Sequence, residues 1–346
     1  MCMNKNYLWI ILFLISYTFA KPSQEIPAIK PEANEVFYIS SINMSNTRGK
    51  IYKIHIALPK HNKDKNIFYT LDGNVFFPML LNLIITNKKG FFKLPIIVGI
   101  GHNSPLAFDR NLRTKDYLPP LEGFLQSEFS GGGGASEFLE FITKKLQPFI
   151  YKSFGKPQKE LLFGHSFGGI FVLYAIMNNW EKFTHYVSAS PSLWWGYGGF
   201  VRNGLINLKN INAKILLTRG SLETQKLDTK QNPININDII KTKDFKKRDF
   251  CYYTLQWQRI HIYKYNKNNS IFYDYSKDFI EEFKEICKDI KNHKKTYPTP
   301  TIKEVLNWLQ LSSINPNNIS FLEFKNKTHG SSIPNALISG IKILEE

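Results

Sequence analysis

The chain has 346 residues, of which 43% are hydrophobic, and it carries a formal net charge of +17. This length and apolar content can bury the core of one large α/β domain or two small ones, which excludes disorder for most of the chain. The charge suggests an anionic partner, but the Lys residues are dispersed and form no long basic block, so we expect no nucleic-acid partner. Two explanations of the charge stay open: a general Lys and Asn bias, and a basic surface that attracts a small polyanionic substrate.

The first twenty residues have the pattern of a secretory signal peptide. Lys5 precedes an apolar run at residues 8–15, and Thr18-Phe19-Ala20 supplies the small-x-small pattern of a cleavage site. The run is too short for a comfortable membrane span, which needs about 20 apolar residues. We therefore expect a periplasmic or secreted protein, cleaved near Ala20, with no stable membrane span afterwards. The alternative is a retained N-terminal anchor.

Two cysteines, Cys251 and Cys287, remain after cleavage, because Cys2 lies in the signal. An oxidising compartment would allow them to form a disulfide. Cys287 also falls within the helical apolar pattern of residues 278–291, where a buried free thiol is an equal alternative.

After a polar lead at residues 21–35, short β-rich runs alternate with helical patterns. The predicted strands are Ile51-Leu58, Ile67-Leu71, Pro95-Ile100, Glu160-Phe163, His185-Ser190, Lys214-Thr218 and Ile319-Lys325. The predicted helices are Val75-Thr86, Ala135-Pro148, Gly169-Asn178, Asp278-Lys291, Ile302-Leu311 and Pro334-Leu344. This alternation predicts an α/β fold with a mostly parallel sheet and helices on both faces, and the continuous apolar strands agree with that.

Residues 230–300 form the least regular part of the sequence and are rich in Lys, Tyr and Phe. No second core is visible, so we expect a single domain over residues 36–346. The irregular part would be a cap-like insert between the last two strands, placed to lean over the site.

Gly164-His165-Ser166-Phe167-Gly168 fits G-x-S-x-G, the nucleophile elbow, and joins a predicted strand to a predicted helix. Ser166 is therefore expected at the carboxyl end of a strand, the edge where open α/β sheets place their sites. The flanking glycines should avoid clashes in the strained turn, and the Phe167 amide should point at a developing oxyanion. The alternative is a Gly-rich turn that happens to contain Ser.

A Ser hydroxyl needs a base to become a nucleophile. His329 follows the last predicted strand and precedes the last helix, which fits the chain order Ser, acid, His. Glu223 follows the strand Lys214-Thr218 and is expected to orient His329 and stabilise its cation. Asp228 is the competing acid, and a Ser-His dyad is the third possibility.

The second oxyanion donor normally comes from the loop after an earlier strand. Here that loop holds Gly73 and Asn74, and we assign the donor to the Asn74 amide with Gly73 as the near alternative. Asp72 is expected to be a structural acceptor in the turn. His102 follows the strand Pro95-Ile100 and is a candidate for lining the substrate pocket.

The sequence shows neither H-x-x-x-H nor C-x-x-C, so we predict no metal. It also lacks G-x-G-x-x-G after a strand, which argues against a dinucleotide, and we expect no cofactor.

With these residues assembled, the chain resembles the putative-esterase family of α/β-hydrolases. Within it, the chain is similar to exported esterases that cleave trilactone catecholate siderophores of the salmochelin, enterobactin and bacillibactin type. The motifs that carry the resemblance are, in order, Tyr69-Thr70-Leu71-Asp72-Gly73-Asn74, Val98-Gly99-Ile100-Gly101, Phe108-Asp109-Arg110 with Arg113, Asp116-Tyr117-Leu118-Pro119, Gly133-Gly134-Ala135 with Phe138-Leu139, Gly164-His165-Ser166-Phe167-Gly168-Gly169, Ser190-Pro191-Ser192-Leu193-Trp194-Trp195 and His329-Gly330-Ser331. The chain departs from the family in its long interval between Glu223 and His329 and in Lys144-Lys145-Leu146-Gln147, where relatives commonly carry an acidic residue.

The resemblance implies an α/β-hydrolase fold, Ser166 as nucleophile, His329 as base, and Arg113 with Trp194 and Trp195 near the substrate. An anionic, aromatic ferric catecholate would suit an Arg and an aromatic wall. The alternatives are core packing for the Trp pair, and an internal ion pair of Arg113 with Asp109 or Asp116.

These observations predict an exported serine carboxylic-ester hydrolase that acts on a small-molecule ester, with an anionic siderophore as the candidate substrate. Two other functions stay open. One is an acyltransferase on the same scaffold, and the other is a non-catalytic anion-binding module.

Overall fold

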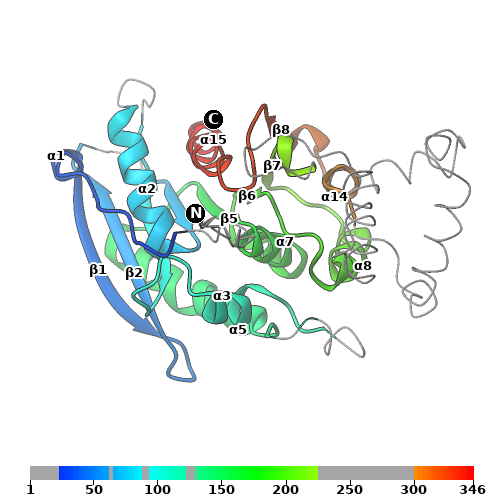
Figure 1. Cartoon of the computed structure of the whole chain (residues 1–346), viewed down its shortest axis with the longest axis horizontal. Helices are drawn as coiled ribbons and strands as arrows, with labels where there is room; N and C mark the ends of the chain where they lie inside the picture. The colour runs from blue at the N-terminus through cyan, green and yellow to red at the C-terminus, as the bar shows by residue number, and fades with distance from the viewer. Residues whose placement is uncertain (1–22, 62–64, 88–92, 122–128, 130, 225–299) are drawn as a thin grey trace, which may run out of the picture.

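The computed structural model describes residues 23–61, 65–87, 93–121, 129, 131–224 and 300–346 (Figure 1). The signal peptide, Asp228, Cys251, Cys287, the predicted helix at 278–291 and nearly all of the predicted insert lie outside the described residues. Within the described ranges, no helix is long and apolar enough to cross a membrane.

An eight-stranded sheet forms the centre of the protein, in the order β1-β2-β4-β3-β5-β6-β7-β8. Its strands are β1 (Phe37–Ser45), β2 (Ile51–Pro59), β3 (Ile67–Thr70), β4 (Ile96–His102), β5 (Glu160–His165), β6 (His185–Ala189), β7 (Lys214–Gly220) and β8 (Ile319–Phe324). The first two strands run antiparallel to their neighbours, and all pairs from β4 to β8 are parallel. The prediction of a mostly parallel α/β sheet is therefore confirmed.

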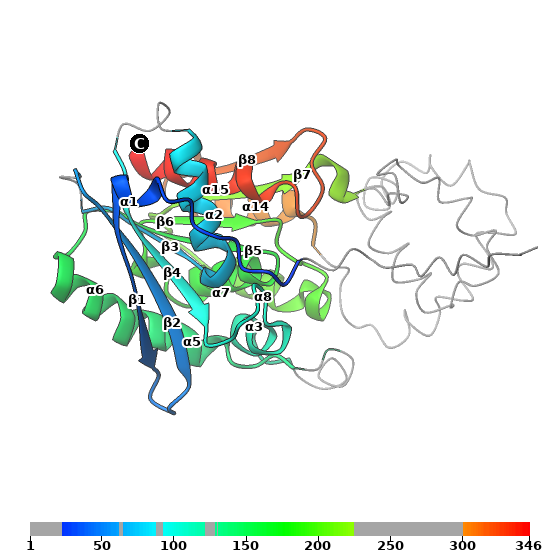
Figure 2. The same ribbon diagram turned by 60° about the vertical axis from the view of Figure 1, so that its left-hand side comes forward.

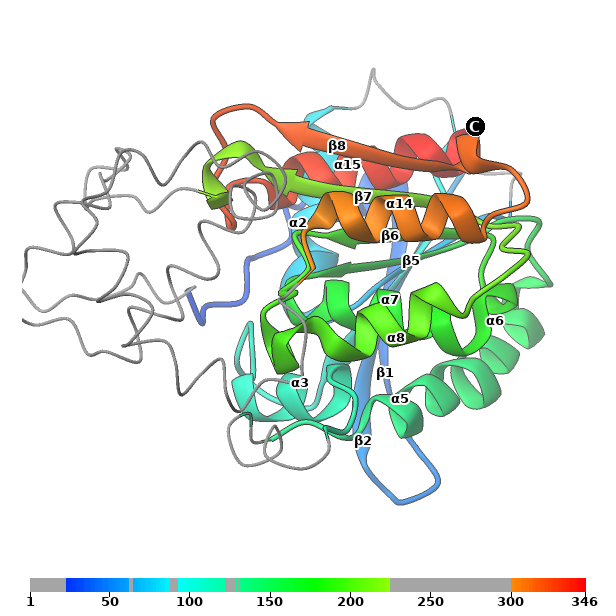
Figure 3. The same ribbon diagram turned by 90° about the vertical axis from the view of Figure 1, so that its right-hand side faces the viewer.

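Helices cover both faces of this sheet, as predicted (Figures 1 and 3). The α-helices are α1 (Ala33–Val36), α2 (Gly73–Thr86), α3 (Arg110–Tyr117), α5 (Ala135–Phe141), α6 (Gln147–Phe154), α7 (Phe167–Asn179), α8 (Gly199–Ile206), α14 (Ile302–Ser312) and α15 (Ile333–Glu345). The short helical turns are η2 (Ile142–Leu146, a π-helix), η3 (Trp180–Lys182), η4 (Trp195–Gly198), η5 (Ser221–Thr224) and η7 (Pro316–Asn318). Figure 2 shows α2 and α15 on one face, and Figure 3 shows α7, α8 and α14 on the other.

Adjacent residues of the central strands belong to two different cores. In β5, Leu162 packs in the core under α7 and Phe163 packs in the core under α2 and α15. The strand is apolar throughout because both of its faces are covered. This accounts for the unbroken apolar runs in the sequence.

Strand β1 and helix α3 were not predicted from the sequence. Among the described strands, β1 lies at the edge of the sheet and pairs with β2 alone. It buries little beyond Phe37, and Ser40, Ser41 and Asn43 interrupt its apolar residues. Helix α3 is largely polar, so it has no apolar pattern that would predict it. The sequence marks its start only by the N-cap Asp109, whose carboxylate accepts a 3.0 Å hydrogen bond from the Leu112 amide.

The helix predicted to end at Pro148 continues to Phe154. Pro148 stands in the first turn of α6, directly after the π-helical turn η2. The preceding residues are already helical, so Pro148 lacks an amide that would otherwise donate into that turn, and the π-helical bonding of η2 accommodates the gap. The proline therefore marks a junction between two helical segments.

Candidate active site

Ser166 lies in the sharp turn between β5 and α7, with φ 61° and ψ −115°. A positive φ is uncommon for a residue other than Gly and is kept only where the surrounding structure holds it. Here the Ser166 amide donates to the Ala189 carbonyl at 3.0 Å, which ties the turn to the neighbouring strand β6. The expected strained elbow is present at this serine.

The glycines of the elbow differ in what they contribute. A Cβ on Gly164 would lie 2.2 Å from the Gly168 oxygen, so no other residue fits there. A Cβ on Gly168 would meet nothing closer than Leu71 Cδ1 at 3.5 Å, an ordinary contact. Gly169 is the second crowded position, since its Cβ would lie 2.9 Å from the Ala189 oxygen. The expectation that Gly168 avoids a clash is thus wrong, and Gly169 has that role.

The structure brings His329 and Glu223 together, as the sequence predicted. His329 Nδ1 donates to Glu223 Oε2 at 2.9 Å. The other carboxylate oxygen accepts from Ser190 Oγ at 2.7 Å and from the Gly220 amide at 2.5 Å. Burial alone would raise the pKa of the Glu223 carboxyl, but the hydrogen bonds from His329, Gly220 and Ser190 lower it below its ordinary value. Glu223 is therefore an anion that faces the imidazole.

The loops that carry this pair are fastened to each other. Strands β7 and β8 are parallel neighbours, so Glu223 in η5 and His329 in the loop before α15 follow the same sheet edge. The Leu222 amide donates to the Lys327 carbonyl at 3.0 Å. A Cβ on Gly220 would lie 2.1 Å from that same Lys327 oxygen, so the close approach of the two loops requires a glycine.

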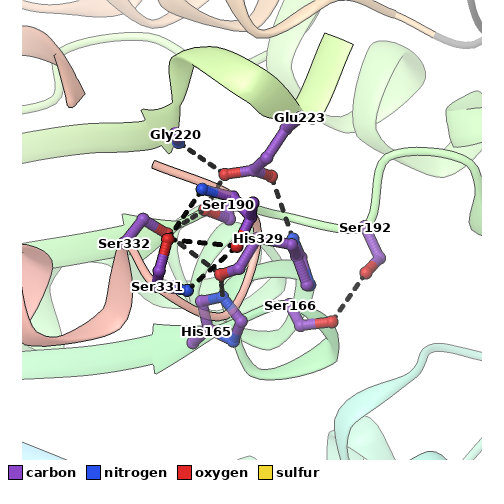
Figure 4. Close-up of polar contacts among 10 residues, drawn as sticks. His165, Ser166, Ser190, Ser192, Gly220, Glu223, His329, Ser331 and Ser332 are labelled. Atoms are coloured by element: carbon purple, nitrogen blue, oxygen red, sulfur yellow. Dashed lines mark hydrogen bonds and ion pairs between the residues drawn. The ribbon is translucent and has the colours of Figure 1, made fainter. Parts of the chain in front are cut away.

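Figure 4 shows the imidazole of His329 between Glu223 and Ser166. The Ser166 hydroxyl is paired with the Ser192 hydroxyl, 2.9 Å away, rather than with the imidazole. Catalytic hydrogen bonds are often long or misaligned before substrate binds, so this arrangement is compatible with proton transfer from Ser166 to His329 after a side-chain rotation.

Ser190 and Ser192 are two polar residues of the site whose roles were not predicted from the sequence. Both follow β6 at the same sheet edge, and both are buried. Ser190 binds Glu223 and Ser192 binds Ser166. Their position directly after a central parallel strand is the signal that could have identified them.

The two expected oxyanion donors belong to the first turns of two neighbouring helices. Phe167 begins α7 after β5, and Asn74 is the second residue of α2, which follows β3. Strands β3 and β5 are adjacent and parallel, so both helices start at the same edge. First-turn amides have no acceptor within their own helix, and both helix dipoles place partial positive charge there.

The Asn74 side chain has a separate structural contact. Its Nδ2 donates to the carbonyls of His102, Ser104 and Leu106 at 3.1, 3.0 and 3.0 Å. These bonds hold the loop after β4 against the start of α2. Next to it, a Cβ on Gly73 would lie 2.6 Å from the main chain at Gly99, so α2 can begin this close to β4 only with glycine.

Arg113 forms a buried ion pair, but its partner is Asp72. Nε donates to Oδ1 at 2.9 Å and the second guanidinium nitrogen donates to Oδ2 at 2.8 Å, and 11% of the Arg113 side chain is exposed. The expected partners are engaged elsewhere: Asp109 caps α3, and Asp116 binds Lys50 and His102. Asp72 takes the guanidinium because it follows β3 in a left-handed conformation beside α3 and α7.

His102 lies inside the protein and belongs to a strand, which corrects the expectation that it follows one. It is the last residue of β4, its side chain is 5% exposed, and Nε2 is 2.9 Å from Asp116 Oδ2. Strand β4 ends two residues later than predicted, so His102 remains between the sheet and the buried rings of Tyr117 and Phe138.

Trp194 and Trp195 lie beside the elbow. Trp195 is 4% exposed, with its ring 5.3 Å from that of Phe129 and 5.9 Å from that of Phe167. Trp194 is partly buried, 5.5 Å from the Phe167 ring. Core packing therefore describes Trp195, whereas Trp194 forms part of an aromatic surface next to Ser166.

Among the residues that the structure describes, no group of three or more His, Cys, Asp or Glu side chains is placed to hold a metal ion.

The family model described as "Putative esterase" matches residues 45–286 of the chain. The siderophore triacetylfusarinine C esterase of Aspergillus fumigatus is 31% identical over 214 residues, which cover 58% of this chain and 65% of the relative. The apo-salmochelin esterase of Escherichia coli O6:H1 is 28% identical over 200 residues, covering 54% and 62%. Each match thus spans less than two thirds of the relative's length.

The chain is also similar in structure to the siderophore hydrolase EstA from Aspergillus nidulans, with a TM-score of 0.62 and 21% identity over 92% of this chain and 97% of that one. This likeness confirms the fold, an α/β-hydrolase sheet with its helices. Since the family model covers more than half of the chain, the protein belongs to the putative-esterase family of α/β-hydrolases.

Proposed function

We propose that the protein is an exported serine esterase that hydrolyses the ester bonds of a siderophore. The observation that supports this best is the 2.9 Å bond from His329 Nδ1 to Glu223 Oε2, at the sheet edge where Ser166 occupies a strained elbow. A serine, an oriented imidazole and a buried carboxylate are the three groups that activate a hydroxyl for attack on an ester.

In the proposed reaction, the hydroxyl of Ser166 breaks its hydrogen bond to Ser192 and attacks the ester carbonyl carbon. His329 Nε2 accepts the hydroxyl proton of Ser166. Glu223 stabilises the imidazolium that forms. The amides of Phe167 and Asn74 donate to the oxyanion of the tetrahedral intermediate. His329 then protonates the leaving alcohol, and an acyl-enzyme on Ser166 remains.

Deacylation repeats these steps with water. His329 takes a proton from the water as it attacks the acyl carbonyl, and returns that proton to Ser166 when the acid departs. The His329 side chain is 48% exposed, so water can reach its imidazole.

A siderophore ester is proposed because two relatives are named for such esters, the triacetylfusarinine C and salmochelin esterases. The aromatic surface of Phe167 and Trp194 beside the nucleophile suits an aromatic substrate. Arg113 contributes less charge than the sequence suggested, because Asp72 neutralises it at 2.8 Å. Binding of an anionic substrate would therefore depend on the aromatic surface and on other basic residues.

The test is a mass-spectrometric assay of wild type and Ser166→Ala on a trilactone siderophore, in apo and ferric forms, beside simple acyl esters and with an added alcohol. We expect linear hydrolysis products from wild type and none above background from Ser166→Ala. The exposed α6 serine variant Ser153→Ala is the control and should match wild type. Equal activity of Ser166→Ala and wild type would refute the proposal, and preferential acyl transfer to the alcohol would replace it with the acyltransferase.

Export is tested separately, by mass spectrometry of the protein recovered outside the cytoplasm. The expected mature N-terminus is Lys21, and an intact N-terminus at Met1 in that fraction would contradict cleavage near Ala20.

A further inference from the structure

His165, the residue before the nucleophile, makes a contact that the proposed mechanism does not use. It is the last residue of β5, and its Nε2 lies 2.9 Å from the main-chain oxygen of His329. A carbonyl oxygen has no hydrogen to give, so Nε2 must carry the proton and donate it. The two imidazole rings are 4.5 Å apart between centroids. The candidate base is thus bonded to the immediate neighbour of the candidate nucleophile.

The surroundings of His165 keep it neutral. The side chain is buried, and burial is the largest cause that lowers its pKa well below the ordinary value. A charge on His329 and the Arg113 guanidinium lower that pKa further, against the raising effect of the bond to the His329 carbonyl. From α2, the facing group is the uncharged ring of Phe76, 6.1 Å away. A neutral imidazole with its hydrogen on Nε2 is a donor whose state does not change near neutral pH.

The His329 main chain is held from a second side as well. Ser332, which is 1% exposed, donates from Oγ to the same carbonyl at 3.0 Å. Ser332 belongs to the start of α15, and its amide bonds the Thr328 carbonyl at 3.0 Å. The His329 carbonyl therefore has one donor from β5 and one from the loop itself. Ser332 lies only three residues from His329, whereas His165 is the residue before Ser166, so the bond from His165 ties the His329 main chain directly to the elbow.

We propose that His165 is a positioning residue that sets the distance between the His329 imidazole and Ser166. This inference rests on the proposed function. Glu223 fixes the ring of His329 at Nδ1 and His165 fixes its main chain, so the direction of Nε2 is determined from both ends of the residue. An apolar side chain at position 165 would fill the same volume and leave the loop held to β5 by packing alone.

The test compares His165→Gln with His165→Asn. The amide nitrogen of Gln lies at about the reach of imidazole Nε2 and can donate to the His329 carbonyl, whereas the shorter Asn amide cannot. Misplacement of a catalytic group by about 1 Å costs roughly 100-fold in rate. We expect Asn to lower kcat for a p-nitrophenyl ester by about 10- to 100-fold with KM little changed, and Gln to recover most of the loss.

Four further readouts separate positioning from a loss of stability. The fluorophosphonate labelling rate of Ser166, which needs the same base, should fall in parallel with kcat in the Asn variant. The acidic limb of the kcat/KM profile should keep its midpoint, because His165 does not titrate there. Thermal unfolding should place both variants at similar midpoints. In wild type, ¹⁵N NMR should show the His165 ring protonated at Nε2 only, a measurement that does not depend on activity.

The inference is refuted if the Asn variant keeps the wild-type kcat, or if Asn and Gln lose activity equally and in step with stability. A His165 ring protonated at Nδ1 in the NMR spectrum also refutes it. These outcomes leave the proposed function intact as long as Ser166→Ala is inactive. If Ser166→Ala keeps wild-type activity, the proposed function fails by its own test.

Discussion

Glu223→Gln replaces the candidate acid by a side chain of the same shape without its charge. The oxygen that accepts from Ser190 and Gly220 has an equivalent in the Gln carbonyl, so that side of the site can persist. The oxygen that accepts from His329 Nδ1 becomes an NH₂ group. A donor facing Nδ1 favours the imidazole tautomer with its hydrogen on Nε2, and that nitrogen then cannot accept the Ser166 proton.

The size of the effect follows from the geometry. Two unit charges about 4 Å apart interact by about 4 kcal/mol at an effective dielectric constant of 20. His329 is 48% exposed, so solvent screening reduces this to about 2–3 kcal/mol at the site. At 1.36 kcal/mol for each tenfold, the lost charge alone lowers kcat by about 30- to 150-fold. The unfavourable tautomer adds to this, so we expect a loss of at least about 100-fold at neutral pH.

The assay is the acylation rate of an activated ester in a single turnover, which isolates the step in which His329 accepts the proton. Asp228→Asn is the matched control, because Asp228 is the competing acid in the sequence. It should keep the wild-type rate. A large loss in Asp228→Asn with an unchanged Glu223→Gln would reverse the assignment, and unchanged rates in both would indicate a Ser-His dyad.

Three other predictions follow from the same contacts. Gly220→Ala places a Cβ 2.1 Å from the main-chain oxygen of Lys327, in the loop that carries His329. It should lower the free energy of unfolding in urea by about 1–3 kcal/mol and should lower kcat. Gly330→Ala is the control and should change neither, because its Cβ would meet nothing within 4 Å. Arg113→Met leaves the Asp72 carboxylate buried without its ion pair and should lower the free energy of unfolding by about 3–5 kcal/mol. A raised KM at unchanged stability would show instead that Arg113 binds the substrate. The pKa of Glu223 is lowered in the folded protein, so its ionised carboxylate stabilises the fold fully above the ordinary pKa of 4.5. This stabilisation is lost as the pH falls through the folded pKa. In thermal unfolding below about pH 4.5, Glu223→Gln should therefore lose stability less steeply than wild type.

The central strands and the elbow could be predicted because each is marked by a pattern within its own short stretch of sequence. The buried parallel strands read as apolar runs, and the elbow combines small residues with a strand-to-helix change. The pairing of Glu223 with His329 followed from chain order, since both come directly after neighbouring strands. Edge strand β1 has no such signal, because little of it beyond Phe37 is buried and Ser40, Ser41 and Asn43 interrupt its apolar residues.

The partners of buried polar groups could not be predicted from local signals. The sequence offers Arg113 the nearby Asp109 and Asp116, yet the pair forms with Asp72, which is 41 residues away along the chain. His165 likewise meets the carbonyl of a residue 164 positions later. Such choices depend on which elements pack together, and a helix pattern does not specify its neighbour.

Three consecutive residues of the elbow serve three different parts of the proposed site. His165 bonds the main chain of His329, and the ring of Phe167 packs against Trp194. In the proposed mechanism, Ser166 supplies the nucleophilic oxygen and the Phe167 amide binds the oxyanion. A shift of this turn would therefore change the base, the nucleophile and the aromatic surface together, and substitutions that move the main chain cannot separate their contributions. Side-chain changes that leave the turn in place can, which is why Ser166→Ala and the pair His165→Gln and His165→Asn are the informative variants.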